Sequence, residues 1–125
     1  RFKTLRVIQV YMENKIVLGL IEKIRLNEEE VMAKIDSGAS RSSIHIKLAS
    51  KLKLGPVIKS VRIKSSHGVQ LRPVVKANVL IAGKKVEGSF TITNRENLKY
   101  PVLIGQEILK QGFLIDPLKN EISDN

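Results

Sequence analysis

The sequence contains no cysteine and no tryptophan, and only three phenylalanines and two tyrosines among its 125 residues. Without cysteine, the chain cannot form disulfides, thiolate zinc sites or cysteine nucleophiles, which is typical of proteins in a reducing compartment. The core must therefore be aliphatic, because Ile, Val and Leu supply most of the hydrophobic 42%. Such richness in β-branched residues favours strands.

Long apolar runs are also lacking. No run reaches the roughly 20 residues that a bilayer-spanning helix needs, and the N-terminus has no uninterrupted apolar region of the kind found in secretory signals. We therefore expect a cytoplasmic protein that is not associated with a membrane. A chain of 125 residues fits one domain, whose folding removes roughly two-thirds of the unfolded surface from water.

The first methionine is Met12, and the eleven residues before it include three basic ones. We interpret residues 1–11 as an upstream or foreign segment and residues 12–125 as the domain. No repeat, linker or low-complexity tract divides the remainder.

The formal net charge is +10, which favours anionic partners and steers their encounter with the protein. The basic residues include Lys47, Lys51, Lys53, Lys59, Arg62, Lys64, Lys84 and Lys85. Nucleic acid is an unlikely partner, because aromatic side chains that could stack on bases are nearly absent. Such lysines are usually explained by a solvated face or by protected sheet edges.

Alternating apolar residues predict most of the strands. Residues 31–35 alternate and end at the turn-forming Asp36-Ser37-Gly38, so a strand delivers Asp36 to a loop. Upstream, residues 16–20 and 24–26 predict a first strand pair, with 27–29 as the polar connection. Strict alternation over 69–81 is the strongest strand signal, and Gly83-Lys84 turns it back into a strand over 86–92.

The remaining elements are shorter. Residues 57–63 predict a strand that ends at the polar tip 65–68, and Pro73 places its stretch at a sheet edge or a bulge. Four-residue spacing over 44–52 predicts a short helix, with another strand as the alternative. A second short helix over 106–111 and a final strand complete a mainly β chain with one or two short helices.

Familiar catalytic motifs are absent: there is no Walker loop, no His-Glu-x-x-His helix and no G-x-S-x-G elbow. The only histidines are His45 and His67, and a hydrolytic zinc site usually takes three protein ligands. We therefore predict no metal and no cofactor.

Two segments carry a resemblance to a known family. The strand that ends in Ile35-Asp36-Ser37-Gly38-Ala39, followed about sixty-five residues later by Val102-Leu103-Ile104-Gly105, resembles the retropepsin-like aspartic peptidases. More closely, residues 17–117 resemble a retropepsin-like group known as ATP-dependent zinc proteases. The matching elements are residues 33–39, Ser42 or Ser43, His45, residues 65–68, 93–95, 103–105 and 115–117. Departures from the pattern are Ser37 for Thr, Ile44 for Leu, Ile46 for Ala and Gln106 for Arg.

The resemblance implies a small closed β-barrel of the acid protease type, with Asp36 as the catalytic carboxylate. It implies the following further roles by position. The carboxylate is supported by Ser37, Gly38 and Ala39. A flap over the substrate is formed by Ser65, Ser66, His67 and Gly68. A structural segment of the site is formed by Leu103, Ile104 and Gly105. The substrate is then a peptide or protein.

The chemistry of such peptidases requires two carboxylates, one ionised and one protonated. Because the chain has a single Asp-Ser-Gly, the second carboxylate must come from a second copy, so we expect a homodimer across a two-fold axis. Terminal segments, 1–11 or 113–125, are the expected contributors to the interface.

Other interpretations remain open at this stage. Asp-Ser-Gly is common in turns, because Asp and Ser bond local backbone donors and Gly accepts positive φ. A non-catalytic dimeric binding module on the same fold is one alternative, and a zinc-dependent protease, as the name of the related group implies, is another. A nucleic-acid binder comes last, and no residue indicates an ATP site.

Overall fold

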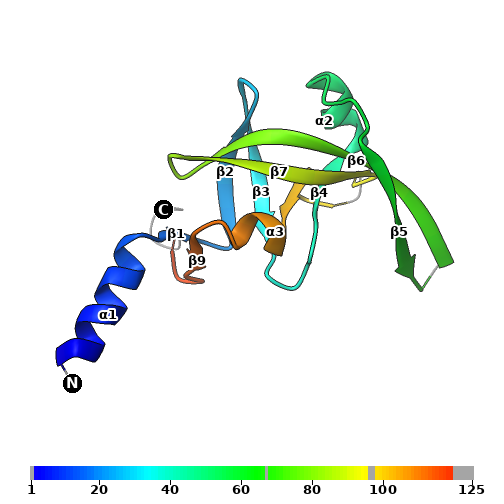
Figure 1. Ribbon diagram of the computed structural model, residues 1–125. Coiled ribbons are helices and arrows are strands. Elements are labelled where there is room, and N and C mark those ends of the chain that lie inside the picture. Colours follow the sequence, from blue (N-terminus) through cyan, green and yellow to red (C-terminus); the bar gives the residue numbers. More distant parts are fainter. Residues whose placement is uncertain (1, 67, 96–97, 120–125) are drawn as a thin grey trace.

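The computed structural model describes residues 2–66, 68–95 and 98–119. Within these residues, six strands close into a barrel in the order β2-β3-β8-β4-β7-β6, and β2 pairs with β6 to complete the circle (Figure 1). They are β2 (Ile21–Leu26), β3 (Glu29–Ile35), β4 (Ser42–His45), β6 (Gly68–Ile81), β7 (Lys84–Thr93) and β8 (Val102–Ile104). The predicted closed, mainly β barrel is confirmed.

The barrel is filled by the aliphatic side chains that the composition led us to expect. Every second residue of β6 from Val75 to Ile81 faces this core, as strict alternation requires. Fully buried partners come from the other strands and include Ile24, Leu26, Ile44, Phe90, Val102 and Ile104. Burying a side chain of this size contributes about 1.5–3 kcal/mol, so the barrel is a rigid frame for the loops at its ends.

Strand β5 (Lys59–Ser65) lies outside the barrel and pairs with β6 over its whole length. The β5–β6 hairpin therefore projects from the barrel as a two-stranded ribbon (Figure 1). Pro73 lies opposite Ser60, one residue beyond the last β6–β7 pair, which joins Val74 to Thr91. Its missing N–H thus costs no ladder hydrogen bond, and the predicted edge position is confirmed.

Three helices occur in the described part of the chain: α1 (Phe2–Glu13), α2 (Ile46–Lys51) and α3 (Gln106–Leu109). The predicted helices over 44–52 and 106–111 are confirmed as α2 and α3. Helix α1 was not predicted, so the described residues contain more helices than the one or two that we expected. It extends away from the barrel (Figure 1) and is too short and too polar to cross a membrane, as are the other described helices.

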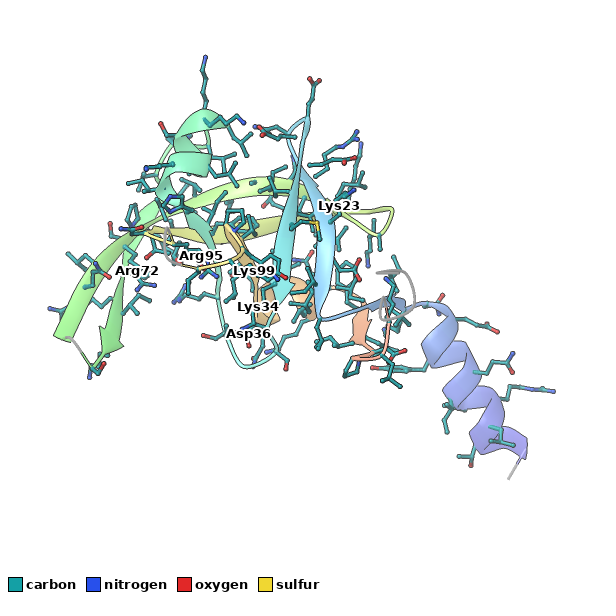
Figure 2. The ribbon with its side chains drawn as sticks, turned by 180° about the vertical axis from the view of Figure 1, so that it is seen from behind. Lys23, Lys34, Asp36, Arg72, Arg95 and Lys99 are labelled. Carbon is teal, nitrogen blue, oxygen red and sulfur yellow. The ribbon has the colours of Figure 1, made fainter. Side chains whose placement is uncertain are left out.

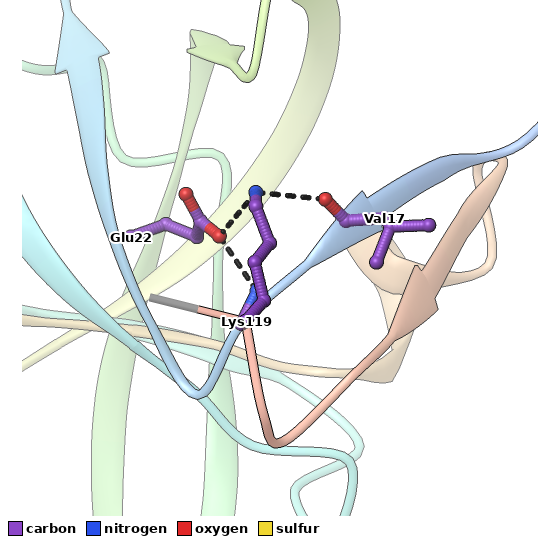
Figure 3. Close-up of polar contacts among 4 residues, drawn as sticks. Val17, Glu22 and Lys119 are labelled. Atoms are coloured by element: carbon purple, nitrogen blue, oxygen red, sulfur yellow. Dashed lines mark hydrogen bonds and ion pairs between the residues drawn. The ribbon is translucent and has the colours of Figure 1, made fainter. Parts of the chain in front are cut away.

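The prediction that the strand over residues 16–20 pairs with the strand over residues 24–26 is wrong. β1 (Ile16–Leu18) pairs in parallel with β9 (Phe113–Ile115) instead of with β2. Near this small sheet, the Glu22 carboxylate accepts hydrogen bonds from Gly19 N at 2.6 Å and from Lys119 Nζ at 2.9 Å. Lys119 Nζ also donates to the Val17 carbonyl at 2.8 Å (Figure 3). These contacts tie the two ends of the domain together.

Candidate active site

Asp36 stands where β3 leaves the barrel. The last residue of β3, Ile35, lies beside Ile104 in the parallel β3–β8 pair, and the main-chain N–H of Asp36 donates to the Ile104 carbonyl at 2.9 Å. Asp36 is therefore held by the end of β8 before the chain turns. The predicted structural segment of Leu103, Ile104 and Gly105 lies directly alongside it.

The Asp36 carboxylate is oriented by its own loop. Its Oδ1 accepts a hydrogen bond from the Gly38 main-chain N–H at 2.9 Å. A Cβ at residue 38 would lie only 3.2 Å from that oxygen, so glycine allows this close approach. Ala39 differs from the expectation, because its N–H donates to the Asp36 main-chain carbonyl at 3.2 Å. The Ser37 hydroxyl makes no hydrogen bond to any other described residue.

The loop is clamped from outside by the start of α3. The Gln106 side chain donates from Nε2 to the Ser37 carbonyl at 2.7 Å, and its main-chain N–H donates to the Ala39 carbonyl at 2.8 Å. A Cβ on Gly105 would lie 2.5 Å from the Arg41 carbonyl oxygen, which leaves room for glycine alone. Gln106, which replaces the Arg of the family pattern, thus has a positioning contact of its own.

Ser42 is a further site residue, whose role the sequence did not reveal. It is fully buried, and its Oγ accepts a hydrogen bond from the Gly105 main-chain N–H at 2.9 Å. This bond joins the far end of the Asp36 loop to the residue after β8. The family pattern named Ser42 or Ser43 without choosing between them, and the geometry gives the two serines different partners.

Ser43 holds Arg95, which is 9% exposed. The Arg95 guanidinium donates from Nη1 to Ser43 Oγ at 3.2 Å and from Nε to the Tyr100 carbonyl at 3.1 Å. Its main-chain N–H donates to Nδ1 of His45 at 2.8 Å, so this ring nitrogen is the acceptor and carries no proton. His45, one of the residues that match the family pattern, therefore fixes the main chain of residue 95.

Arg95 lies within electrostatic reach of the Asp36 carboxylate. Burial lowers the pKa of the Arg95 guanidinium from its ordinary value, Arg72 lowers it further, and Asp36 acts in the opposite direction. Figure 2 shows Asp36, Arg95 and Arg72 on the side of the barrel to which the β5–β6 hairpin extends. Since arginine keeps its proton at any ordinary pH, the surroundings of Asp36 are cationic.

The predicted flap coincides with the tip of the β5–β6 hairpin. Ser65 pairs with Gly68, and Ser66 lies in the turn between them. Gly68 has a φ of 107°, which favours glycine. His67, also predicted for the flap, lies outside the described residues. The hairpin and the Asp36 loop extend to the same side of the barrel in both views (Figures 1 and 2).

One cavity adjoins the Asp36 loop, and a larger one lies elsewhere on the barrel. An open cavity of about 350 Å³ lies next to the Asp36 loop and is lined by Tyr11, Ser37, Gln106 and Phe113 among others. A larger one, of about 1280 Å³, is lined by residues of the β2–β3 hairpin, α2, β6 and β7. Asp36 lines neither of them, so these cavities of the single chain do not enclose the carboxylate.

Among the described residues, no three His, Cys, Asp or Glu side chains lie close enough together to hold a metal ion. His45 uses Nδ1 to accept from Arg95.

Comparison with known proteins finds a family model that covers more than half of the chain. The family model described as RimB-like, "Retropepsin-like aspartic endopeptidase RimB", matches residues 48–125. The match begins after the Asp36 loop and includes β5 to β9. Among curated proteins, none matches the chain.

Two solved structures share the fold. A protein of unknown function from Legionella pneumophila, Lpg0085, has 22% identity and a TM-score of 0.58, with 81% of this chain and 92% of that one covered. The protease of simian foamy virus (mac) has 19% identity and a TM-score of 0.58, with 72% of this chain and 91% of that one covered. At these identities the likeness shows the fold.

Proposed function

The chain belongs to the RimB-like family of retropepsin-like aspartic endopeptidases, and from this premise we propose that it is a homodimeric aspartic peptidase. Asp36 of each protomer supplies one of the two catalytic carboxylates. The observation that carries the proposal is the loop itself: Asp36 follows a barrel strand, Gly38 N–H orients its carboxylate, and Gly105 and Gln106 hold the loop in place.

The proposed reaction divides one proton between the two carboxylates. The ionised one takes a proton from water as the water adds to the scissile carbonyl, and the protonated one donates to the carbonyl oxygen. The tetrahedral intermediate then collapses as the leaving nitrogen is protonated. Two ionised carboxylates about 3 Å apart repel by roughly 5 kcal/mol at an effective dielectric of 20, so the pair retains one proton.

The face around the Asp36 loop supports dimerisation. Exposed apolar side chains of α1, which are Leu5, Val7, Ile8 and Tyr11, have no cover in the single chain. Tyr11 also lines the cavity that Ser37 and Phe113 border, so the end of α1 adjoins the Asp36 loop. A second copy that covered this face would bury the apolar side chains and bring the two Asp36 loops together. In such a dimer the segment 1–11 would contribute to the interface, which is one of the two terminal segments expected from the sequence.

The charge distribution favours acidic peptides as substrates. From residue 37 to residue 86 every formally charged side chain is a lysine or an arginine. This stretch contains α2 and the β5–β6 hairpin, and Arg72 of that hairpin lies within electrostatic reach of Arg95. A site lined by one sign of charge concentrates ligands of the other sign. The hairpin would close over such a peptide and exclude water.

Turnover of an internally quenched, glutamate-containing peptide tests the proposal. We expect the wild-type protein to cleave it and the Asp36→Asn variant to lose cleavage while it sediments as the same dimer. Glu28→Gln is the matched control, because this exposed carboxylate lies in the turn between β2 and β3 and lines the large cavity, to which Asp36 does not contribute. Equal cleavage by the wild type and Asp36→Asn would contradict the proposal.

Two alternatives give different results in the same assay. A zinc-dependent protease, as the resemblance to the ATP-dependent zinc proteases implies, would lose activity on chelation and regain it with zinc. A non-catalytic binding module would bind the peptide without cleaving it. We expect activity that is indifferent to chelators and to ATP.

A further inference from the structure

Helix α3 lies against a stretch of β7 that has no strand beside it. On one side β7 pairs with β6, and on the other side it pairs with β4 only over residues 90–93. Over residues 84–89, no strand in the described part of the chain covers the edge of β7 that faces away from β6. An uncovered edge leaves main-chain N–H and C=O groups without strand partners. Here, side chains of α3 and the turn after it bond some of those groups.

The two side chains that do so are those of Glu107 and Gln111. The Glu107 carboxylate accepts a hydrogen bond from the Ser89 main-chain N–H at 2.9 Å. The Gln111 side chain donates from Nε2 to the Glu87 main-chain carbonyl, also at 2.9 Å. Ser89 and Glu87 are two residues apart, as main-chain groups on one edge of a strand are. The helix is therefore fastened to β7 near its start and just after its end.

The start of α3 also holds the Asp36 loop. The Glu107 main-chain N–H donates to the Ser40 carbonyl at 3.3 Å. The Gln106 main-chain N–H donates to the Ala39 carbonyl at 2.8 Å. Glu107 is thus bonded to the loop through its main chain and to β7 through its side chain. A single residue connects the loop that carries the carboxylate to a long strand of the barrel.

The bond to β7 is the contact that holds the Glu107 side chain. The residue is exposed, and no Lys or Arg of the described ranges lies within ion-pair distance of its carboxylate. An ion pair therefore does not explain where this side chain lies. The Ser89 N–H does, because hydrogen bonds to a carboxylate are stronger than those between neutral groups.

We propose that Glu107 is a positioning residue of the active site, and that its bond to β7 sets where the Asp36 loop stands at the end of the barrel. Gln111 is the second fastening of the same helix. This inference rests on the proposed function, because the loop has to place its carboxylate against that of a second copy. A misplacement of about 1 Å can cost an enzyme about 100-fold in rate, so the frame that holds such a loop matters to turnover.

The role depends on an acceptor oxygen at residue 107. Glu107→Ala removes the acceptor, whereas Glu107→Gln keeps an oxygen on a side chain of the same length. We expect Glu107→Ala to lower kcat about 3- to 10-fold with little change in KM, and Glu107→Gln to stay within about 2-fold of the wild type. Glu87→Ala is the matched control. It removes a carboxylate of β7 that pairs with Lys76 at 3.6 Å, and it keeps the main-chain carbonyl that bonds Gln111.

Backbone amide NMR spectra test the inference without turnover. The signals of Asp36, Ser37 and Gly38 report on the loop, and none of these residues is a sequence neighbour of residue 107. We expect the three signals to move in Glu107→Ala and to keep their wild-type positions in Glu107→Gln and Glu87→Ala. Because Glu107→Gln also lacks the negative charge, it separates the loss of the hydrogen bond from the loss of the charge.

The outcomes separate the two proposals. If the loop signals move in Glu107→Ala alone but the wild-type protein cleaves no peptide, the positioning role stands and the peptidase proposal fails. If kcat and the loop signals of Glu107→Ala match the wild type, or if Glu107→Ala and Glu107→Gln differ from it equally, the inference is overturned. Gln111→Met keeps the test decisive if Glu107→Ala does not fold. It removes the donor to the Glu87 carbonyl and should move the same loop signals, and their persistence at wild-type positions would overturn the inference.

Discussion

The Gly105 main-chain N–H donates a 2.9 Å hydrogen bond to the hydroxyl oxygen of Ser42, and both residues are buried. The bond spans 63 positions of sequence. It joins the start of β4, which follows the Asp36 loop, to the turn between β8 and α3. The loop is thereby closed at both ends, because its other end is bonded to Ile104.

Removing the Ser42 hydroxyl should destabilise the protein. In Ser42→Ala the Gly105 N–H loses its acceptor in a buried position, which costs about 1–3 kcal/mol of unfolding free energy. Urea denaturation measures the change. Ser40→Ala is the matched control, since Ser40 is exposed and accepts from Glu107 through its main-chain carbonyl only. A loss no greater than that of the control would contradict this role for Ser42.

Gly105→Ala should lower turnover by more than its loss of stability explains. The new Cβ would lie 2.5 Å from the Arg41 carbonyl oxygen and 2.8 Å from that of Ala39, so the Asp36 loop has to move. Gly88→Ala provides the comparison, because its Cβ would meet only side chains, with Ile108 Cδ1 nearest at 2.5 Å. We expect both variants to be destabilised, and Gly105→Ala alone to lose turnover per folded molecule. Similar turnover in the two would show that the loop tolerates displacement.

Periodicity predicted the barrel strands because each has one buried face. The alternation over residues 69–81 gave β6, and residues 31–35 gave a strand that ends at Asp36. Pairing between distant segments leaves no such periodic trace. The parallel β1–β9 pair was therefore missed, and β1 was assigned to its neighbour in sequence. Helix α1 was missed because residues 1–11 were treated as an upstream segment.

The site was predictable only in part, for a similar reason. Asp36 and the glycine after it are recognisable as a local turn. Arg95 lies in a segment without regular alternation, and the Thr-Asn-Arg motif was noted without a role. Its position is fixed by Tyr100, which is near in sequence, and by Ser43 and His45, which come from a distant part of the chain. Such contacts become visible only after the barrel has closed.

Gln106→Ala should lower kcat with little change in stability. The side chain is partly exposed, but its Nε2 donates to the carbonyl of Ser37, the residue after Asp36. Losing one such bond is worth about 0.5–1.5 kcal/mol, or roughly 2- to 10-fold if it is expressed in turnover. Steady-state kinetics with a thermal melt separates the two effects. A drop in melting temperature without a change in kcat would make Gln106 a purely structural residue.

Glu22→Ala should destabilise the junction of the chain ends. The Glu22 side chain is 11% exposed and accepts from Gly19 and Lys119. Its loss leaves both donors without that acceptor, at a cost of about 1–3 kcal/mol. The exposed Glu28 provides the control, and Glu28→Ala should be near neutral. Because the Glu22 contacts are largely shielded from solvent, added salt should reduce the difference only slightly, as chemical denaturation at two ionic strengths would reveal.

The central claim is that one active site needs Asp36 from two chains, and subunit mixing tests it most directly. Wild-type and Asp36→Asn chains are mixed at constant total concentration, allowed to exchange, and assayed for peptide cleavage. With equal amounts of the two chains and random pairing, only dimers with two wild-type chains are active, so about one quarter of the wild-type activity should remain. If about one half remains, and activity falls in direct proportion to the fraction of wild-type chain, each chain acts alone and the shared pair of carboxylates is contradicted.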